Sequence, residues 1–218
     1  MVVQWLGHAS FLVISADGTK IITDPYEPGA FDGGISYGPI EIPPDIVTVS
    51  HDHADHSYIE GLPNEFAVVS HAGSTTEKGI NFKGVESYHD PEQGALRGRN
   101  IMFVMNVDHI RVCHLGDLGH ELGDREASEL GEVDVLLVPV GGYYTIGPEE
   151  ASRVVDHLDP KVVMPMHFRT DKCSFPIAPV DDFLRGKQNV KVLDTSEYEI
   201  TKEQLPDTRE IVVLKHAL

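Results

Sequence analysis

Cysteine is scarce in this chain, which holds only Cys113 and Cys173 among its 218 residues. Two cysteines allow one disulfide at most, so a secreted scaffold held together by several disulfides is excluded. Both residues lie in segments that look buried, where a free thiol behaves as a small apolar side chain. We therefore expect two reduced thiols and a cytoplasmic protein.

Long apolar runs are also missing from the sequence. No stretch approaches the roughly 20 consecutive apolar residues that a membrane-spanning helix needs. The N-terminal segment has no basic part and reaches His8 before an apolar run develops, so it does not resemble a signal peptide. We expect no membrane partner.

Positive charge is in short supply, because 17 Lys and Arg residues face 35 Asp and Glu residues and leave a net charge of −18. A surface this acidic repels phosphodiester backbones, so we expect no nucleic acid partner. The hydrophobic fraction of 41% excludes a disordered acidic tail and suffices for one sizeable core. No shift in composition marks a boundary, and we expect a single domain over residues 1–218.

The hydrophobic pattern predicts strands in the first half of the chain and strands mixed with helices in the second. Predicted strands cover residues 2–6, 11–14, 20–23, 46–49, 67–70, 85–88, 101–106, 110–114, 133–140, 161–164, 190–193, 198–201 and 211–214. Predicted helices cover residues 125–130, 148–158 and 180–184. Between them, residues 27–44 are rich in Gly and Pro and predict a long loop. This order of elements favours two packed sheets with helices outside them.

Histidine is abundant, with 12 residues, and the segment His51–His56 reads His-Asp-His-Ala-Asp-His. It directly follows a predicted buried strand. His51 and His53 are two residues apart, so in extended backbone they project to the same side and can share one cation. Asp55 and His56 follow where we expect the chain to turn into a helix, which aims them at a neighbouring point. Nitrogen with carboxylate ligands suits zinc, and also iron or manganese.

A site with two cations needs further ligands, including a carboxylate that bridges both ions. Three later residues qualify, since each closely follows a predicted strand: His89, Asp117 and His167. Strand ends are where sites usually lie in layered α/β folds. We therefore expect these side chains to converge on the His51–His56 segment.

The segment His51–His56 resembles the H-x-H-x-D-H signature of the metallo-β-lactamase superfamily. The later residues also follow that superfamily's order, with a lone His, a Gly-Asp pair and a second lone His. Further segments resemble the branch that contains L-ascorbate 6-phosphate lactonase and zinc-dependent hydrolases. They are Trp5–Ser10, Thr23–Pro25, His114–Asp117, Pro139–Gly142 with Thr145, and Pro165–Phe168. The resemblance runs from about residue 5 to residue 170.

This resemblance implies an α/β fold, the four-layer αββα sandwich of the metallo-β-lactamase type, with a binuclear metal site at one edge. The implied cofactors are two divalent metal ions, zinc in the first place, with manganese and iron as alternatives. Transferred by position, His51, His53 and His89 hold one metal, Asp55, His56 and His167 hold the other, and Asp117 bridges both. Many members have a glycine two residues after the signature, where this chain has Tyr58. That difference leaves the ligands intact.

Two cations that share an oxygen ligand lower the pKa of bound water and supply a Lewis acid. We therefore expect a binuclear metal-dependent hydrolase whose bridging hydroxide attacks a small ester, lactone, amide or phosphate ester. Asp55 is the expected catalytic residue, since a ligand carboxylate keeps a free oxygen that orients the nucleophile and accepts its proton. The small-molecule substrate can itself be anionic, because the local field of the metals dominates at short range.

Other residues are candidates for roles around the metals. Asp24 is expected to fix a ligand imidazole, with an ordinary turn aspartate as the alternative. His8 is expected in the pocket or as a donor to a ligand. The resemblance implies that His114 supports the ligands without binding metal, and direct metal ligation is the alternative. Tyr144 and Thr145 lie in a loop where substrate can bind, and packing against that loop is the alternative.

Arg97 and Arg99 flank Gly98 in a segment that we interpret as an exposed hairpin. Contact between these arginines and an anionic substrate is the alternative. The oligomeric state is left open by the sequence.

Three other functions compete with a small-molecule hydrolase. A nucleic acid phosphodiesterase of this superfamily usually carries an added domain or clamping arm, for which a short acidic chain leaves little room. A diiron oxidoreductase usually replaces the second His of the signature by Glu, whereas this chain has His53. A non-catalytic binding module tends to lose ligands, whereas all seven positions are occupied here. The hydrolase is therefore the favoured interpretation.

Overall fold

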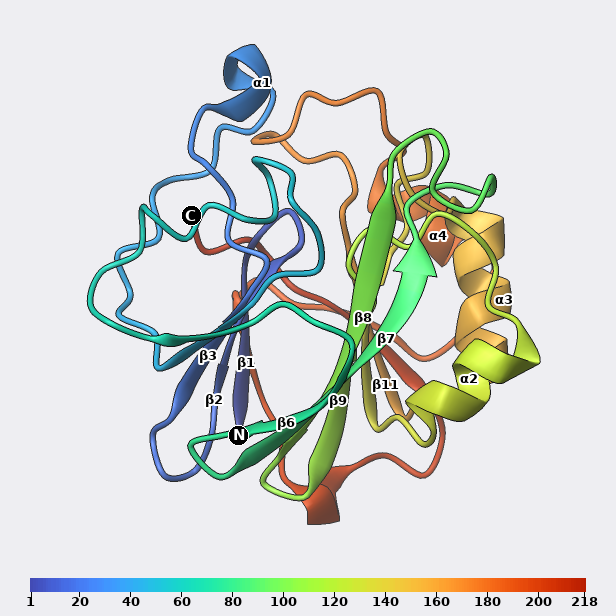
Figure 1. The fold of residues 1–218 in the computed structure, drawn as a ribbon. Helices are drawn as coiled ribbons and strands as arrows, with labels where there is room; N and C mark the ends of the chain where they lie inside the picture. Colours follow the sequence, from blue (N-terminus) through green and yellow to red (C-terminus); the bar gives the residue numbers. More distant parts are fainter.

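The computed structural model describes residues 1–218. Its main feature is a pair of β-sheets that pack against each other (Figure 1). One sheet contains β1 (Val2–Gly7), β2 (Ser10–Ile14), β3 (Lys20–Thr23), β4 (Ile46–Thr48), β5 (Ala67–Val69) and β13 (Glu197–Glu199). Its strand order is β13-β1-β2-β3-β4-β5. Strands β3, β4 and β5 are parallel, so their carboxyl ends lie at one edge.

The second sheet is larger and supplies most of the core. It contains β6 (Gly73–Glu77), β7 (Ile80–Tyr88), β8 (Arg99–Val107), β9 (Ile110–His114), β10 (Val135–Pro139), β11 (Val162–Met166), β12 (Val190–Val192) and β14 (Glu210–Val213). Its order is β12-β14-β11-β10-β9-β8-β7-β6. Strands β10 and β11 are buried along their whole length, because the other sheet covers one face and helices cover the other.

Three helices cover the outer face of the eight-stranded sheet: α2 (Asp124–Leu130), α3 (Pro148–Leu158) and α4 (Val180–Leu184) (Figure 1). Helix α3 begins with Pro148 at its first turn, where the missing N–H is not needed. Its buried residues, Ala151, Val154, Val155 and Leu158, recur at helical spacing and form the apolar face. The remaining short elements are α1 (Ala30–Gly33) and the 3-10 helix η1 (Lys202–Gln204).

The outer face of the six-stranded sheet is covered largely by irregular chain. Leu12 and Ile22 of that sheet pack in a second apolar cluster with Tyr26, Tyr37 and Ile40 from the loop that follows β3. This loop is the Gly- and Pro-rich segment predicted over residues 27–44. The layered α/β architecture expected from the sequence is therefore confirmed. Aromatic residues of this loop cover the outer face of the six-stranded sheet, as helices cover the outer face of the eight-stranded sheet.

Most predicted elements are present, but one expected helix is absent and the sequence does not predict one strand. No helix follows the segment His51–His56, because the backbone N–H groups of His56 and Ser57 both donate to the carbonyl of His53, at 2.9 Å each, and close a turn. The N–H of Tyr58 then donates to the carbonyl of Pro25, which diverts the chain. Strand β6 was not predicted, since its sequence Gly-Ser-Thr-Thr-Glu has no apolar residue. No helix of the structure has the length and apolar character needed to cross a membrane.

Candidate metal centre

The predicted ligands lie at one end of the molecule, where several strands release the chain into loops. The segment His51–His56 follows β4, His89 follows β7, Asp117 follows β9 and His167 follows β11. Strands β7, β9 and β11 run in the same direction, so these ends share one edge of the larger sheet. The loops meet around a cavity of about 660 Å³.

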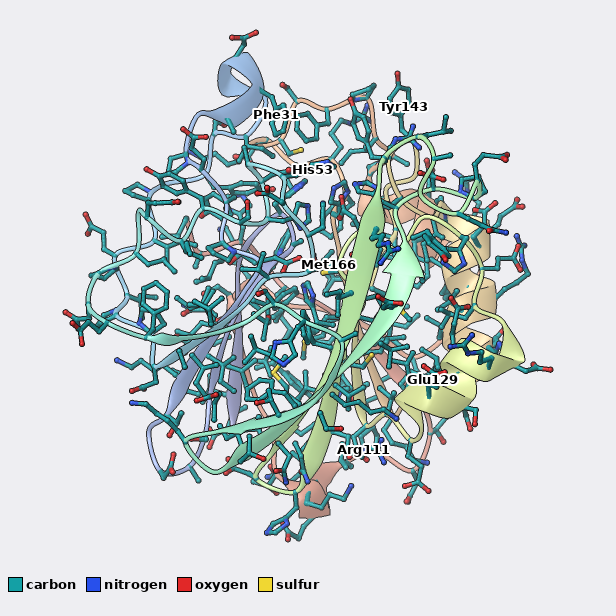
Figure 2. All side chains as sticks on the ribbon, viewed as in Figure 1. Phe31, His53, Arg111, Glu129, Tyr143 and Met166 are labelled. Atoms are coloured by element: carbon teal, nitrogen blue, oxygen red, sulfur yellow. The ribbon has the colours of Figure 1, made fainter.

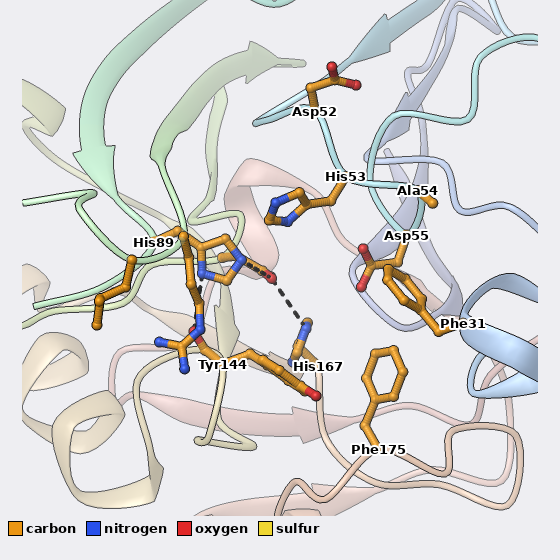
Figure 3. A pocket seen from close by; sticks show the side chains of 12 residues that line it. Phe31, Asp52, His53, Ala54, Asp55, His89, Tyr144, His167 and Phe175 are labelled. Atoms are coloured by element: carbon orange, nitrogen blue, oxygen red, sulfur yellow. Dashed lines mark hydrogen bonds and ion pairs between the residues drawn. The ribbon is translucent and has the colours of Figure 1, made fainter.

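Figure 2 shows which labelled residues lie at the end of the molecule that holds this cavity and which lie at the other end. Phe31, His53 and Tyr143 lie toward the cavity end, and Arg111 and Glu129 lie toward the opposite end. The closer view in Figure 3 shows the side chains that line the cavity, which come from the loops of both sheets.

Three histidines form the first group of potential ligands. One ring nitrogen each of His51, His53 and His89 lies within 4.8 Å of the others. The Oγ of Ser50 lies 2.8 Å from Nδ1 of His51, and Nδ1 of His89 lies 3.1 Å from the carbonyl of Tyr144. These contacts turn Nε2 of His51 and of His89 toward the group, where Nε2 of His51 lies 3.0 Å from Nδ1 of His53. Burial, followed by the nearby His56, lowers the pKa of His51 to about 3, so this imidazole is neutral at pH 7.

A second group contains His8, Asp55, His56 and His167, again within 4.8 Å of one another. The sequence placed His8 beside the ligands, and the structure puts its Nε2 3.0 Å from Oδ2 of Asp55. Burial and the neighbouring His167 lower the pKa of His8 to about 4, so a neutral His8 donates to the Asp55 carboxylate. Burial raises the pKa of Asp55, but the facing imidazoles of His56 and His8 lower it more, and the carboxylate stays ionised.

Asp117 lies between the two groups and contacts both. Its Oδ2 is 3.1 Å from Nε2 of His89 and 3.4 Å from Nε2 of His167, and its Oδ1 is 3.2 Å from Nε2 of His56. Burial raises the pKa of Asp117, but His167 and His56 hold it well below its usual value. All seven residues expected to converge are thus brought to one place.

Several polar atoms at this place are buried without a hydrogen bond, among them Nδ1 of His8 and Nδ1 of His167. Nε2 of His56 and Oδ1 of Asp117 also have none, because they lie 3.2 Å apart but are not aligned for a hydrogen bond. A buried polar atom without a partner costs about 1–3 kcal/mol, so such a cluster needs an explanation. The opposite nitrogen of His56 is satisfied, since Nδ1 lies 2.9 Å from Oδ2 of Asp24. One ring nitrogen held by a carboxylate and the other left free is the arrangement of a metal-binding histidine. The donor set therefore fits divalent cations.

Asp24 supports the site in a second way. Its Oδ1 accepts the backbone N–H of Ser50 at 2.8 Å, and its Oδ2 accepts the Ser50 hydroxyl. Since Ser50 in turn contacts His51, one buried carboxylate orients a residue of each histidine group. This matches the position expected for Asp24 from the sequence.

Two other candidates are not brought to the cavity. Nε2 of His114 lies 2.8 Å from the carbonyl of Ala9, and its Nδ1 accepts the N–H of Gly116, so both ring nitrogens are engaged by the backbone. His114 thereby links the two sheets behind the site. The hydroxyl of Thr145 donates to the carbonyl of Ile146 and does not line the cavity, whereas the neighbouring Tyr144 does.

The mouth of the cavity contains residues that sequence reasoning missed or placed elsewhere. Phe31, Leu96 and Phe175 line it, although single apolar residues in irregular segments give no periodic signal (Figure 3). Arg97 also lines it; the predicted hairpin is present as the β7–β8 connection, but Arg97 is half-buried there rather than exposed. Arg99 is exposed and pairs with Glu86 outside the cavity.

Comparison with known proteins adds independent information. Residues 2–167 match a family described as beta-lactamase superfamily domain. A UPF0173 metal-dependent hydrolase of Methanopyrus kandleri is 28% identical over 99% of this chain and 97% of its own length. Its counterpart in Thermococcus kodakarensis is 30% identical over 77% of this chain and 84% of its own.

A solved structure is also similar over nearly the whole chain. It comes from Thermotoga maritima and is described as a protein of the metallo-beta-lactamase superfamily. The two chains are 40% identical, with a TM-score of 0.80 and coverage of 98% of this chain and 97% of the other.

Proposed function

The chain belongs to the beta-lactamase superfamily, and from this membership we propose that it is a hydrolase with a binuclear divalent metal centre. The family confirms the metallo-β-lactamase type of α/β fold expected from the sequence, and its named relatives are metal-dependent hydrolases. The observation that carries the binuclear centre is the pair of ligand groups joined by Asp117. Zinc is the proposed metal, with manganese or iron as alternatives, since the donors are imidazole nitrogens and carboxylates.

The proposed reaction is hydrolysis of a small ester, lactone, amide or phosphate ester. Two bound cations supply Lewis acidity and lower the pKa of a water molecule. Asp55 is the proposed catalytic residue, because its ionised carboxylate lies in the cavity wall and can accept a proton from water there. His8 holds one oxygen of Asp55 and so orients the carboxylate.

A small-molecule substrate is proposed because the cavity is of the size that encloses such ligands. The net charge of −18 supports the absence of a nucleic acid partner. A cytoplasmic location is proposed because Cys113 and Cys173 are buried free thiols rather than a disulfide.

Metal analysis together with a substrate panel tests the proposal. We expect two equivalents of zinc per chain, and turnover of one class among 4-nitrophenyl esters, lactones and bis-4-nitrophenyl phosphate. His53→Ala and Asp117→Asn are each expected to lower kcat by about 100-fold or more and to lower the metal content, while circular dichroism stays unchanged. His71→Ala is the control, because this histidine is exposed and belongs to neither group. Full activity in both site variants contradicts the binuclear hydrolase.

A further inference from the structure

The guanidinium of Arg97 lies in the cavity wall and has no carboxylate partner. Most arginines of this acidic chain are neutralised by carboxylates: Arg99, Arg125, Arg153, Arg185 and Arg209. The side chain of Arg111 donates to the carbonyl of Leu130. The guanidinium of Arg97 takes part in no hydrogen bond or ion pair, so its N–H donors are free toward the cavity.

Asp90 fixes the backbone of the loop that carries Arg97. The buried carboxylate of Asp90 accepts four backbone N–H groups between residues 92 and 97, including that of Arg97, at 2.7–3.0 Å. The Arg97 guanidinium carbon then lies 5.8 Å from the centroid of the Tyr144 ring, within range of a cation–π contact. A cation–π contact uses the face of the guanidinium and leaves its N–H edge available to an anion.

The same cavity has an apolar wall that includes Phe31, Leu96, Tyr144 and Phe175. The ring centroid of Phe175 is 5.4 Å from that of Phe31 and 5.5 Å from that of Tyr144, both in edge-to-face contact. Figure 3 shows Phe31 and Phe175 on the Asp55 side of the cavity and Tyr144 nearer His89. Phe31, Phe175 and Tyr144 thus form a continuous row of rings along the cavity wall, and Arg97 lies beside the Tyr144 end of that row.

The backbone near the aromatic residues that line the cavity is strained, and this strain lowers the stability of the fold. Phe31 has φ 55° and ψ 51°, a left-handed conformation that is unfavourable for a bulky residue, yet its side chain is 55% exposed. A Cβ on Gly34 would lie 2.7 Å from Cε1 of Phe175, so glycine is needed there to admit that ring. Backbone strain around an exposed aromatic group points to a ligand-binding role.

We propose that this cavity takes an ester or lactone that carries both an oxyanion group, a carboxylate or phosphate, and an apolar arm. Arg97 binds the oxyanion, and the aromatic residues of the mouth hold the arm. The inference rests on the proposed hydrolase function and names the substrate class for that site. Arginine suits the oxyanion because its planar fork donates two parallel N–H groups to a carboxylate or phosphate.

A matched pair of esters tests the role of Arg97. Mono-4-nitrophenyl glutarate and 4-nitrophenyl pentanoate share a leaving group and differ in the charge at the end of the acyl arm. For the metal-loaded protein we expect kcat/KM for the anionic ester to exceed that for the neutral one by about tenfold or more, since hydrogen bonds to charged groups are strong. In Arg97→Gln this ratio is expected to fall by about tenfold, and Arg97→Lys is expected to retain part of it.

Two arginine variants serve as controls for total charge and for the loop. Arg99→Gln removes a charge two residues away but outside the cavity, and Arg169→Gln removes another arginine that has no carboxylate partner. Both are expected to keep the wild-type ratio. An equal fall in all three variants shows a general charge effect and overturns the assignment of Arg97.

Binding without turnover separates this inference from the proposed function. The probes are 4-phenylbutanoate, 2-phenylethyl phosphate and the neutral 4-phenylbutanamide, and the readout is the shift in Tm of the metal-loaded protein. We expect one or both anions to raise Tm more than the amide does, and to lose this advantage in Arg97→Gln but not in Arg99→Gln. The more effective anion distinguishes carboxylate from phosphate recognition.

Equal stabilisation of wild type and Arg97→Gln means that the anion binds elsewhere, for example to the metals, and overturns the inference. If the anions bind in an Arg97-dependent manner but none of the esters is hydrolysed, the proposed hydrolase function fails for esters and the oxyanion site stands.

Discussion

At the scale of single residues, Asp24 controls the site without entering the cavity. Its carboxylate is fully buried, lies 2.9 Å from Nδ1 of His56 and accepts the N–H of Ser50. Burial raises the pKa of Asp24, but the surrounding imidazoles, led by His114, lower it by more than burial raises it, so the group is an anion at pH 7. An anion at this point directs the free Nε2 of His56 into the site.

Replacing this anion by a neutral amide tests that role. Asp24→Asn keeps an oxygen for Ser50 but cannot satisfy His56 equally well, so we expect metal affinity to fall by about 10–100-fold. A titration against a competing chelator measures the change. Asp52→Asn is the matched control, since Asp52 is an exposed carboxylate of the His51–His56 segment that belongs to neither ligand group. Equal affinities for Asp24→Asn and wild type contradict the role given to Asp24.

At the scale of elements, the segment from Asp90 to Arg97 is irregular yet ordered by one side chain. Four backbone N–H groups, which have no strand or helix partner, all donate to the Asp90 carboxylate. Buried N–H donors need a hydrogen-bond partner, and a loop that lacks these hydrogen bonds opens more often. The order of this loop therefore depends on Asp90 rather than on hydrophobic packing.

Proteolysis reports that dependence directly. Asp90→Ala is expected to increase the rate of tryptic cleavage after Arg97 by about tenfold or more, because the loop opens without its acceptor. Glu92→Ala changes an exposed side chain of the same loop and is expected to leave the rate unchanged. Similar cleavage of Asp90→Ala and wild type would show that other contacts hold the loop.

The elements also show where sequence patterns suffice. Strands β3 and β9 and helices α3 and α4 have the bounds predicted from the sequence, because their apolar residues recur at the period of the element and turn residues flank them. Strand β6 has no apolar residue and forms by pairing with β7, a contact that no local pattern contains. The turn at His53–Ser57 replaces a predicted helix because a distant carbonyl, that of Pro25, captures the N–H of Tyr58.

At the scale of the whole molecule, the same distinction applies to the site. Residues such as His89 and Asp117 could be named from the sequence because each follows a predicted strand within a known order of motifs. The mouth could not, since Phe31, Arg97 and Phe175 come from three loops whose meeting depends on the tertiary fold. For His8 the sequence predicts a place in the pocket or a contact with a ligand, and the tertiary fold decides that the ligand is Asp55.

Buried acids outside the site make the whole molecule sensitive to alkali. Burial raises the pKa of the Cys113 thiol to about 12 and also raises the pKa of Tyr26 and Tyr37. In the unfolded chain a thiol ionises near a pKa of about 8.5. Between these values the unfolded chain has lost a proton that the folded chain keeps, so the free energy of unfolding falls as the pH rises.

We therefore expect the urea midpoint to be steady from pH 7 to 8 and to decrease progressively from about pH 9 to pH 12. The loss from Cys113 is of the order of a few kcal/mol, since each unit of pKa difference is worth about 1.4 kcal/mol. Cys113→Ala is expected to be less stable at pH 7 but to show a shallower decrease. A midpoint that does not change up to pH 11 contradicts this prediction.

The irregular cover of the six-stranded sheet has a consequence for how such proteins diversify. Candidate ligands lie just beyond the ends of strands, whereas Phe31 lies in α1, within the segment after β3 that contributes to the outer cover. Insertions or exchanges in that cover leave the strand ends where they are. Related chains can therefore differ in the loops around the cavity while the candidate ligands keep their places at the strand ends.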